Sequence, residues 1–550
     1  MDSQRNWIKD PGLWLVFTLY LALGLYSFNR GLFLADEGYQ VYFGSILARG
    51  AKVYKDFHVN TAPLSLLLYA LLTRIFGLKI IVYKTFELLL ATAGFFAVAS
   101  LSRKIVPAKY WLLGSALYIV YSNNLYTFMI FTMEARNFLL LALALMVAWR
   151  ESGDRRALFA AGFFASMAGF SNQSFGAIAL VMAAAFLFFR DQKTSPGRLK
   201  PPAFFAAGFL VPALAIGVYL ARERLIEEFV RTMLVSGPSS KQHVYHVLLT
   251  AIIPACAAAS LVVLAGSRLW GLGRKAEAVA LSLVAGIAAL VFLSLKNPAL
   301  IPHLVSLLIP VGVLTLSGNG LAREKSPAGY WLIWSACVLI FAVGLLSGYD
   351  LAHNLQYGVF ILPWIARIIA RWQDAPGRKI FRLRPAALAS LALLFAAGAY
   401  LVASRREFYG RVEPLWKCNS RLEIPAARGI YTSRGQKQEL EALVQKIDQL
   451  CRPNEKILVY PNQMMIYSLA GRDSLAKMPY FYYELVEIQD LEAAAKKALA
   501  SKSLVVFELE GGKIRQPIIG PQAARIVDRL SNACVEKIWL TNYLVCPLGE

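Results

Sequence analysis

The stretch Ala35-Asp36-Glu37-Gly38-Tyr39 places two adjacent carboxylates directly after the first apolar run of the chain. A charged carboxylate beside a lipid phase is costly unless it stays hydrated or serves a function. The residues around this pair are apolar or cationic. The stretch therefore predicts a functional site at the surface of a membrane, and this placement restricts both the fold and the activity.

The composition is typical of a membrane protein. Of the 550 residues, 57% are hydrophobic and 17% are charged, whereas soluble domains carry about 25% charged residues. Apolar runs long enough to cross a bilayer as helices recur from residue 13 to residue 402. These runs lack the two-residue alternation of barrel strands. The sequence therefore predicts a polytopic α-helical membrane protein, since helices satisfy their own backbone groups in lipid.

The basic residues predict the orientation. The formal net charge is +23, but most Lys and Arg residues lie in short clusters in every second loop between apolar runs. This is the positive-inside pattern, which indicates orientation signals and contact with anionic membrane lipids rather than nucleic-acid binding. With a cytoplasmic N-terminus, about 13 transmembrane helices place the C-terminus outside. They are predicted at residues 12–28, 80–101, 110–126, 135–149, 157–170, 175–189, 203–220, 247–266, 278–295, 304–317, 330–346, 359–370 and 386–402.

The chain divides into two predicted parts. Residues 1–403 form a multi-pass transmembrane domain of the cell inner membrane, with a first periplasmic loop at 29–79. That loop contains an amphipathic helix at 37–49, ended by Gly50, and a stretch at 63–76 too short to span a bilayer. Charged residues become frequent beyond residue 404, and residues 404–550 are predicted to form a periplasmic α/β domain. Its predicted strands are 456–460, 504–507, 535–540 and 543–545, and its predicted helices 462–470 and 490–499, the latter with Asp490 as N-cap.

Four cysteines lie in the second part. An oxidising compartment favours two disulfides, and we predict the pairs Cys418–Cys451 and Cys534–Cys546. The domain contains no CxxC pair and no histidine, so structural metal binding is not expected there.

Three acids are candidates for chemistry. Asp36 is predicted to be a general base that takes a proton from an attacking hydroxyl, and the alternative is an N-cap of the loop helix. Glu37 is expected to form a local hydrogen bond or to help bind substrate or a metal ion. Glu134 starts a span, where it either brings a second carboxylate to the same cleft for acceptor or metal binding, or pairs structurally with Arg136.

Basic side chains on the outer face oppose the orientation rule and so require a reason. They lie in two outer loops, and all five histidines also fall on this face. Binding of a phosphate group is one reason, since Lys and Arg donate charge-assisted hydrogen bonds to it; contact with lipid headgroups is the other. The candidates for substrate binding are Lys55, His58, Arg222, Arg224, Arg231, His243 and His303, with Lys52, Lys241, His246 and His353 nearby in sequence or on the same face.

The order of five short motifs in the first loop resembles the N-terminal signature of the lipid-linked-sugar glycosyltransferases. These enzymes have the GT-C membrane fold and include protein O-mannosyltransferases and lipid A aminoarabinose transferases. The motifs are Ala35-Asp36-Glu37-Gly38-Tyr39, Leu47-Ala48-Arg49-Gly50, Tyr54-Lys55-Asp56-Phe57, Ala62-Pro63-Leu64 and Ile75-Phe76-Gly77. The likeness continues more weakly through Glu134, residues 171–174, Pro302-His303-Leu304 and the stretches 458–461 and 469–472.

This resemblance implies a polyprenyl-phosphate sugar as donor and a hydroxyl of a lipid, glycan or protein as acceptor. Asp36 matches the acid of the first loop in that family and would be the base. The chain departs from the pattern at Thr61-Ala62-Pro63, where relatives often carry His-Pro-Pro or Pro-Pro, and at Gln173, where many carry lysine. No cofactor is required, and a divalent cation is compatible with the acids on this face.

Two other classes of function remain open. A transporter or flippase of lipid-linked sugars would place ionisable groups near the middle of the bilayer and show internal repeats. An inactive scaffold that binds partners through its C-terminal part would have no cavity beneath that part. The acids and histidines gather at one face, and we find no convincing repeat, so the sequence favours the glycosyltransferase.

Overall fold

The computed structural model describes residues 7–59, 61–108, 110–121, 129–188, 200–233, 317, 333–335, 337, 359–374, 415–481, 488–516 and 521–549. Five of the predicted spans, those from 247–266 to 330–346 and the one at 386–402, lie wholly or almost wholly outside these residues. The predicted number of about 13 membrane helices therefore stays a prediction.

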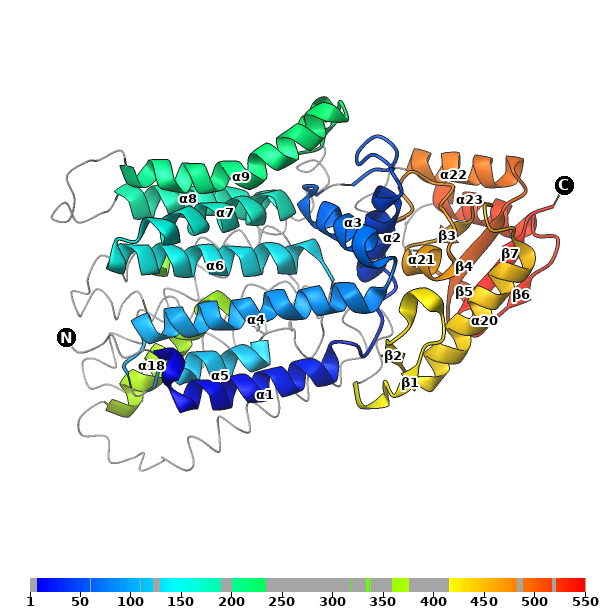
Figure 1. The fold of residues 1–550 in the computed structure, drawn as a ribbon. Helices are drawn as coiled ribbons and strands as arrows, with labels where there is room; N and C mark the ends of the chain where they lie inside the picture. The colour runs from blue at the N-terminus through cyan, green and yellow to red at the C-terminus, as the bar shows by residue number, and fades with distance from the viewer. Residues whose placement is uncertain are drawn as a thin grey trace, which may run out of the picture.

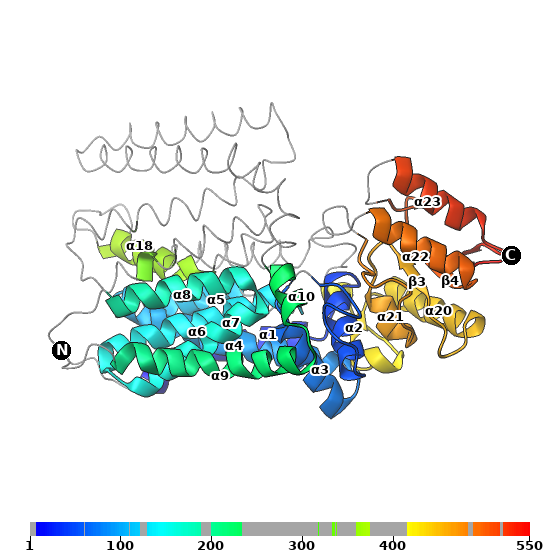
Figure 2. The ribbon, with the colours of Figure 1, turned by 90° about the horizontal axis from the view of Figure 1, so that it is seen from above.

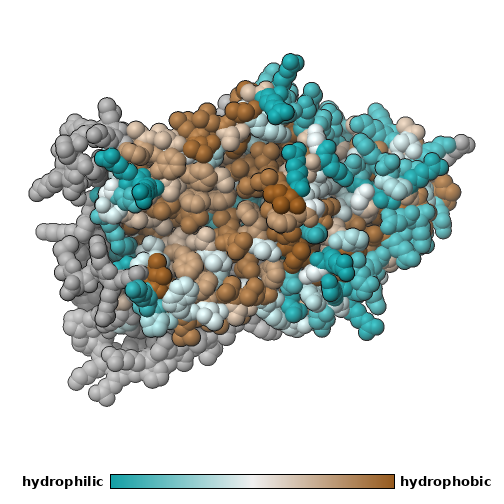
Figure 3. Space-filling view, viewed as in Figure 1, coloured by the Kyte–Doolittle hydropathy of each residue, from teal (hydrophilic) through white to brown (hydrophobic). Residues whose placement is uncertain are grey.

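Long apolar helices lie side by side in one half of the molecule (Figure 1). Among the described residues, three are long and apolar enough to cross a membrane, namely Ile80–Ile105, Phe131–Ser152 and Pro201–Arg222. Hydrophobic side chains cover the visible face of this bundle, and hydrophilic ones cover the other half (Figure 3). The helices of the bundle in the described part of the chain are α1 (Pro11–Ser27), α4 (Ile80–Ile105), α5 (Leu112–Tyr121), α6 (Phe131–Ser152), α7 (Arg155–Ser171), α8 (Gln173–Phe188), α9 (Lys200–Arg222) and α18 (Leu362–Asp374).

Small residues allow the helices of the bundle to approach closely. A Cβ atom added to Gly162 of α7 would collide with the backbone carbonyl of Phe205 on α9. A Cβ added to Gly208 of α9 would collide in the same way with the carbonyl of Phe159. Close backbone approach through small residues is a common way to hold helices together in lipid, where apolar burial between helices gains little.

The bundle has two chemically different ends. The described chain begins at one end, where the basic termini of α4 and α6 also lie and Lys104 pairs with Glu151. The first loop and the whole C-terminal region lie at the other end (Figures 1 and 2). The acids at residues 36 and 37 are therefore on the opposite side of the bundle from the basic clusters, as the charge pattern predicts.

The first loop contains two helices, α2 (Asp36–Ala48) and α3 (Leu64–Phe76). Helix α2 runs across the ends of the bundle helices (Figure 1) and is buried over most of its length. Helix α3 leaves Leu71, Ile75 and Phe76 about half exposed. This exposed apolar edge fits the predicted interfacial position of the short apolar stretch.

The C-terminal region is built on a mixed sheet with strand order β3-β4-β7-β6, and β5 pairs with β4. Strand β3 is parallel to β4, whereas β7 is antiparallel to both β4 and β6. The last two strands coincide in part with the predicted strands 535–540 and 543–545, and they pair as a hairpin. The strands are β3 (Leu458–Tyr460), β4 (Leu504–Glu510), β5 (Lys513–Ile514), β6 (Ile538–Trp539) and β7 (Tyr543–Pro547), and a separate pair is β1 (Ser420–Arg421) with β2 (Tyr431–Thr432).

Both faces of the mixed sheet are covered. Val459 and Val506 point to a core shared with α20, α21 and the first loop, while Leu458 and Phe507 point to a second core with α22 and α23. This follows from the alternation of side chains along a strand. The helices of this region are α20 (Arg434–Leu450), α21 (Met465–Ala470), α22 (Ile488–Ala500) and α23 (Pro521–Asn532), preceded by the short helices η9 (Leu415–Lys417) and η10 (Pro425–Ala427). The first part of the chain also contains the short helices η1 (Trp7–Lys9), α10 (Ile226–Arg231) and η7 (Val359–Ile361).

Two predictions for this region are wrong in detail. Asp490 is not the N-cap of its helix, because α22 already begins at Ile488. Cys534 and Cys546 form the predicted disulfide, but Cys418 and Cys451 are separate buried thiols. The carbonyl of Cys418 accepts from Arg30, whereas Cys451 caps the far end of α20 beside Arg472. Burial raises the pKa of the Cys451 thiol to about 11, so it stays protonated.

Candidate functional site

Asp36 lies at the junction of the bundle, the first loop and the C-terminal region. It is the first residue of α2, the N-cap position is Ala35, and no side chain caps the helix. The N-cap role considered for Asp36 is therefore wrong. Its carboxylate is partly exposed, and its Oδ1 accepts a hydrogen bond of 2.9 Å from the Tyr480 hydroxyl of the C-terminal region. The dipole of α2 favours negative charge at this end of the helix.

Glu37 is locked in a buried ion pair. Its Oε1 is 2.9 Å from Nζ of Lys84 on α4, and each of the two side chains is 2% exposed. Its Oε2 accepts a hydrogen bond of 3.0 Å from the backbone N–H of Phe33. This is the local hydrogen bonding expected for Glu37, and it fixes the start of α2 to the bundle.

A second group of buried polar side chains lies where α3, α4 and α6 meet. The hydroxyl of Tyr69 donates to Glu87 Oε1 at 2.8 Å. Glu134 is fully buried and lies close to Glu87, Tyr69 and Ser65. Arg136 bonds to the side chain of its neighbour Asn137. Glu134 therefore faces another carboxyl group rather than the solvent, at the same end of the bundle as Asp36.

The outer basic residues form an exposed rim on two adjoining segments. Lys52 pairs with Glu223 at 2.8 Å, and the ring of Tyr54 lies 6.0 Å from that of Phe229, so the loop packs beside the end of α9 and α10. The hydrogen bond from Lys52 lowers the pKa of Glu223. The candidates on this rim are all exposed: Lys55, His58, Arg222, Arg224 and Arg231.

The histidines His243 and His303 lie outside the described residues, as do Lys241, His246 and His353. Their predicted roles stay predictions. The structure thus brings Asp36, Glu37 and Glu134 to one end of the bundle and gathers five of the predicted basic residues at the same end.

Sequence reasoning missed three polar residues of this end. Lys84 and Glu87 are charged residues inside an apolar span, which is itself a signal of a functional or paired group. Tyr480 carries no such signal, because a tyrosine 444 residues from Asp36 could be placed beside it only by the tertiary fold.

The described residues contain no group of three His, Cys, Asp or Glu side chains that converge on a metal position. Glu37 does not fit as a cation ligand, since Lys84 and the N–H of Phe33 occupy its two oxygens. Asp36, which is partly exposed, fits better.

A cleft with a volume of about 1110 Å³ is lined by the segment before Asp36 and by the C-terminal region. Its floor includes Leu32, Phe33 and Leu34, and α20 and the turn between β6 and β7 form its walls. Leu34 precedes Asp36 by two residues, so the cleft ends close to the acid. This volume slightly exceeds the range of about 300–1,000 Å³ that is typical of small-molecule sites.

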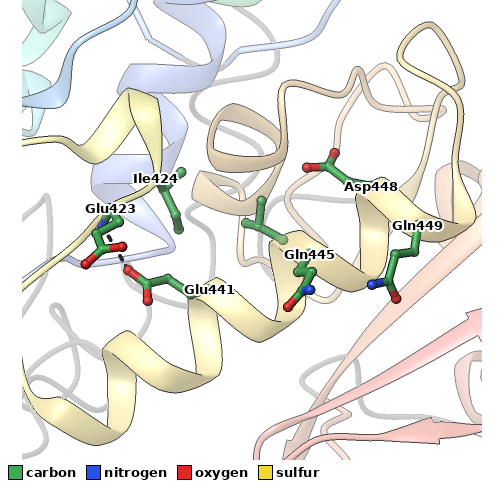
Figure 4. A pocket seen from close by; sticks show the side chains of 7 residues that line it. Glu423, Ile424, Glu441, Gln445, Asp448 and Gln449 are labelled. Atoms are coloured by element: carbon green, nitrogen blue, oxygen red, sulfur yellow. Dashed lines mark hydrogen bonds between the residues drawn. The ribbon is translucent and has the colours of Figure 1, made fainter.

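A smaller hollow on the far side of α20 is acidic but internally satisfied (Figure 4). The backbone N–H of Glu423 donates to Glu441 at 2.8 Å, and Lys437 pairs with both acids. Asp448 pairs with Arg472 at 2.9 Å. These contacts assign the hollow of Figure 4 to structure rather than to binding.

Comparison with solved structures identifies the fold. The oligosaccharyltransferase of Archaeoglobus fulgidus, in a complex with Zn and sulfate, matches over 90% of this chain and 68% of its own, with a TM-score of 0.51 and 14% identity. The same enzyme with an inhibitory peptide and a dolichol-phosphate matches with a TM-score of 0.48 and 13% identity, over 91% of this chain and 70% of its own. ArnT from Cupriavidus metallidurans, bound to undecaprenyl phosphate, matches over 99% of this chain and 98% of its own, with a TM-score of 0.47 and 13% identity.

The protein has the GT-C membrane fold that its first loop resembles. A scan of protein-family models and a search of curated proteins gave no match.

The buried pair Glu37–Lys84 generates a prediction about stability. Lys84→Met leaves the Glu37 carboxylate buried without its charge partner, which costs about 3–5 kcal/mol. Glu37→Gln combined with Lys84→Met costs less than Lys84→Met alone, because no unpaired charge remains. Equilibrium unfolding in mixed micelles measures both.

The matched control is Lys104→Met, which breaks the more exposed Lys104–Glu151 pair at the opposite end of the bundle. Exposed pairs contribute about 0–1 kcal/mol. If Lys84→Met and Lys104→Met lowered the free energy of unfolding equally, the result would contradict a special role for the buried pair.

Proposed function

We propose that this protein is an integral-membrane glycosyltransferase, which moves a sugar from a polyprenyl-phosphate donor to a hydroxyl acceptor on the extracytoplasmic side. The central observation is the position of Asp36. It is a partly exposed acid at the end of an apolar bundle, fixed by neighbours on two sides and next to a large cleft. The first-loop motifs and the shared fold of an oligosaccharyltransferase support the same class of reaction.

The reaction is an inverting transfer. The Asp36 carboxylate takes the proton of the acceptor hydroxyl, and the oxygen attacks the anomeric carbon from the face opposite the phosphate. The new C–O bond forms as the bond between the anomeric carbon and the phosphate oxygen breaks, and the lipid phosphate leaves with the bonding electron pair. Tyr480 orients the base by donating to Oδ1.

The basic rim stabilises the leaving phosphate. Preorganised cations directed at developing charge usually provide the largest part of catalysis. Within the rim, Lys55 and His58 come from the first loop. Arg222 ends α9, Arg224 follows it, and Arg231 ends α10. His243 and His303 belong to the same proposed phosphate and substrate site. The alternative role for these basic residues is contact with lipid headgroups.

The proposal assigns residues 1–403 to the transmembrane catalytic domain and residues 404–550 to an extracytoplasmic α/β domain. The positive-inside pattern supports a cytoplasmic side at the basic end of the bundle, which puts Asp36 and the C-terminal region outside. For a bacterial cell this is the periplasmic face of the inner membrane.

Two observations favour transfer over the alternatives. A transporter is expected to place its ionisable site at mid-depth, whereas Asp36 begins a helix that runs across the end of the bundle (Figure 1). A scaffold without activity predicts no cavity beneath the C-terminal region, whereas a cleft of about 1110 Å³ is present there.

A divalent cation is compatible with the proposal, and a Zn complex is known for the oligosaccharyltransferase that shares the fold. Among the described acids, the partly exposed Asp36 would hold it, whereas Glu134 is fully buried against Glu87. Such a cation would polarise the phosphate of the donor. The proton transfer by Asp36 does not depend on it.

The proposed activity predicts release of lipid phosphate. Purified protein incubated with a panel of polyprenyl-phosphate sugars and envelope acceptors is expected to release lipid phosphate from at least one donor, as measured by thin-layer chromatography of a radiolabelled lipid. Heat-unfolded protein serves as the control. Retention of the sugar on every donor would contradict the proposal.

The contact with Tyr480 predicts a second effect. Tyr480→Phe removes a hydrogen bond to a charged group, which is worth about 1.5–3 kcal/mol, so the transfer rate is expected to fall about 10- to 100-fold with little change in donor KM. Single-turnover transfer measures this loss.

The matched control is Tyr460→Phe, also in the C-terminal region. The hydroxyl of Tyr460 is buried and has no hydrogen-bond partner among the described residues, so its removal is expected to be nearly neutral. Equal rates for the Tyr480 variant and the unmodified protein would remove Tyr480 from the site.

A further inference from the structure

Two tryptophans line the cleft between the first loop and the C-terminal region. Trp416, in the short helix η9, is 48% exposed, and Trp539, on β6, is 56% exposed. Two such rings on one cleft suit a binding surface, because tryptophan is enriched at interfaces, where one part of the ring is buried and another meets water. Their flat rings provide apolar faces on which the C–H faces of a sugar ring stack.

The remaining lining is polar and electrically balanced. Lys417 and Arg434 are basic, whereas Glu439 and Glu508 are acidic, so the charged groups of the lining have no net charge. Such a lining does not favour a phosphate or an acidic chain, which would require excess cations. Planar amides complete it, including those of Gln438 and Gln463, and each of these two supplies donors and acceptors for hydroxyl groups. The amide of Asn542 already donates to Glu439 at 2.6 Å.

One buried acid in this lining lacks a partner for one of its oxygens. The Glu508 side chain is 6% exposed, and its Oε1 accepts from Arg515 at 3.0 Å. Its Oε2 is buried and has no hydrogen-bond partner among the described residues. A buried acceptor without a partner costs free energy, and a ligand hydroxyl in the cleft would satisfy it.

The cleft leads toward the proposed catalytic acid. Gln436 on α20 donates to the carbonyl of Leu32 at 3.4 Å, and Met465 donates to the carbonyl of Leu34 at 2.8 Å. These bonds hold the segment just before Asp36 as the floor of the cleft. A chain lying along α20 from Trp539 would therefore reach the surroundings of Asp36.

We propose that this cleft binds a saccharide chain and that this chain is the acceptor. The proposal rests on the proposed function for the acceptor role, but saccharide binding itself rests on the two tryptophans, the balanced lining and the unpaired oxygen of Glu508. Among the three acceptor types, lipid, glycan and protein, it selects the glycan.

Two alternative roles for the cleft account for fewer of its residues. Tryptophans also anchor proteins at membrane interfaces, which suits Trp416 near the bundle but not Trp539, which is on an edge strand of the C-terminal sheet. A peptide could pair with that edge strand, but pairing would leave Glu508 and the amides around α20 unused.

The test measures saccharide binding separately from transfer. Neutral oligosaccharides are titrated into the purified full-length protein in detergent and observed by saturation-transfer NMR. Trp539→Ala is expected to weaken binding about tenfold, Trp539→Phe to retain most of it, and Trp14→Ala, which changes a 43% exposed tryptophan of α1 outside the cleft, to leave it unchanged. In the transfer assay, Trp539→Ala should raise the acceptor KM about tenfold without lowering kcat.

The other possible results overturn the saccharide site, the acceptor role or the proposed function, as follows. Equal saccharide binding by the unmodified protein, Trp539→Ala and Trp539→Phe, or binding of neutral peptides but of no saccharide, would overturn the cleft assignment. Transfer by Trp539→Ala with an unchanged acceptor KM would overturn the acceptor role while the proposed function stands. Saccharide binding in the cleft without transfer from any donor would overturn the proposed function and the acceptor role, but not the binding site.

Discussion

The ion pair between Glu37 and Lys84 is the constraint on which the rest of the site depends. It joins the start of α2 to a helix of the bundle at 2.9 Å in a place almost without solvent. A buried pair of this kind contributes little net stability, but the loss of one partner is severe. The main effect of the pair is to position the residue next to it. Because Glu37 is fixed, the neighbouring carboxylate of Asp36 must project at the edge of the bundle, where reactants can reach it.

The C-terminal region completes this arrangement from the other side. A Cβ at Gly38 would lie 2.9 Å from the Met465 Cα, so only glycine allows α2 and α21 to pack at this distance. The backbone N–H of Ser474 donates to the Tyr42 hydroxyl at 2.8 Å, and Tyr480 reaches Asp36 itself. The region beyond the bundle is thus part of the site, since it orients the acid and forms one wall of the cleft beside it.

The sequence predicts the parts of this structure that depend on local pattern. Apolar length predicts the bundle helices from α1 to α9 to within a few residues, and short apolar runs predict β3, β4 and the two strands of the final hairpin. The adjacent acids identify the site because charged residues beside an apolar span are costly and therefore rare. Contacts between distant segments could not be predicted in this way. Tyr480 is an ordinary tyrosine in the sequence, and only the fold brings it to Asp36. The predicted Cys418–Cys451 disulfide is wrong, because the sequence does not show which cysteines the fold brings together.

The most direct measurement compares the transfer rates of Asp36→Asn and the unmodified protein under single-turnover conditions. Loss of a general base is expected to slow transfer about 10²- to 10⁴-fold. Asp473→Asn, which changes an exposed acid of the same end that pairs with Arg49 at 2.5 Å, should transfer normally. A folded Asp36→Asn protein that transfers sugar at the unmodified rate would contradict the account.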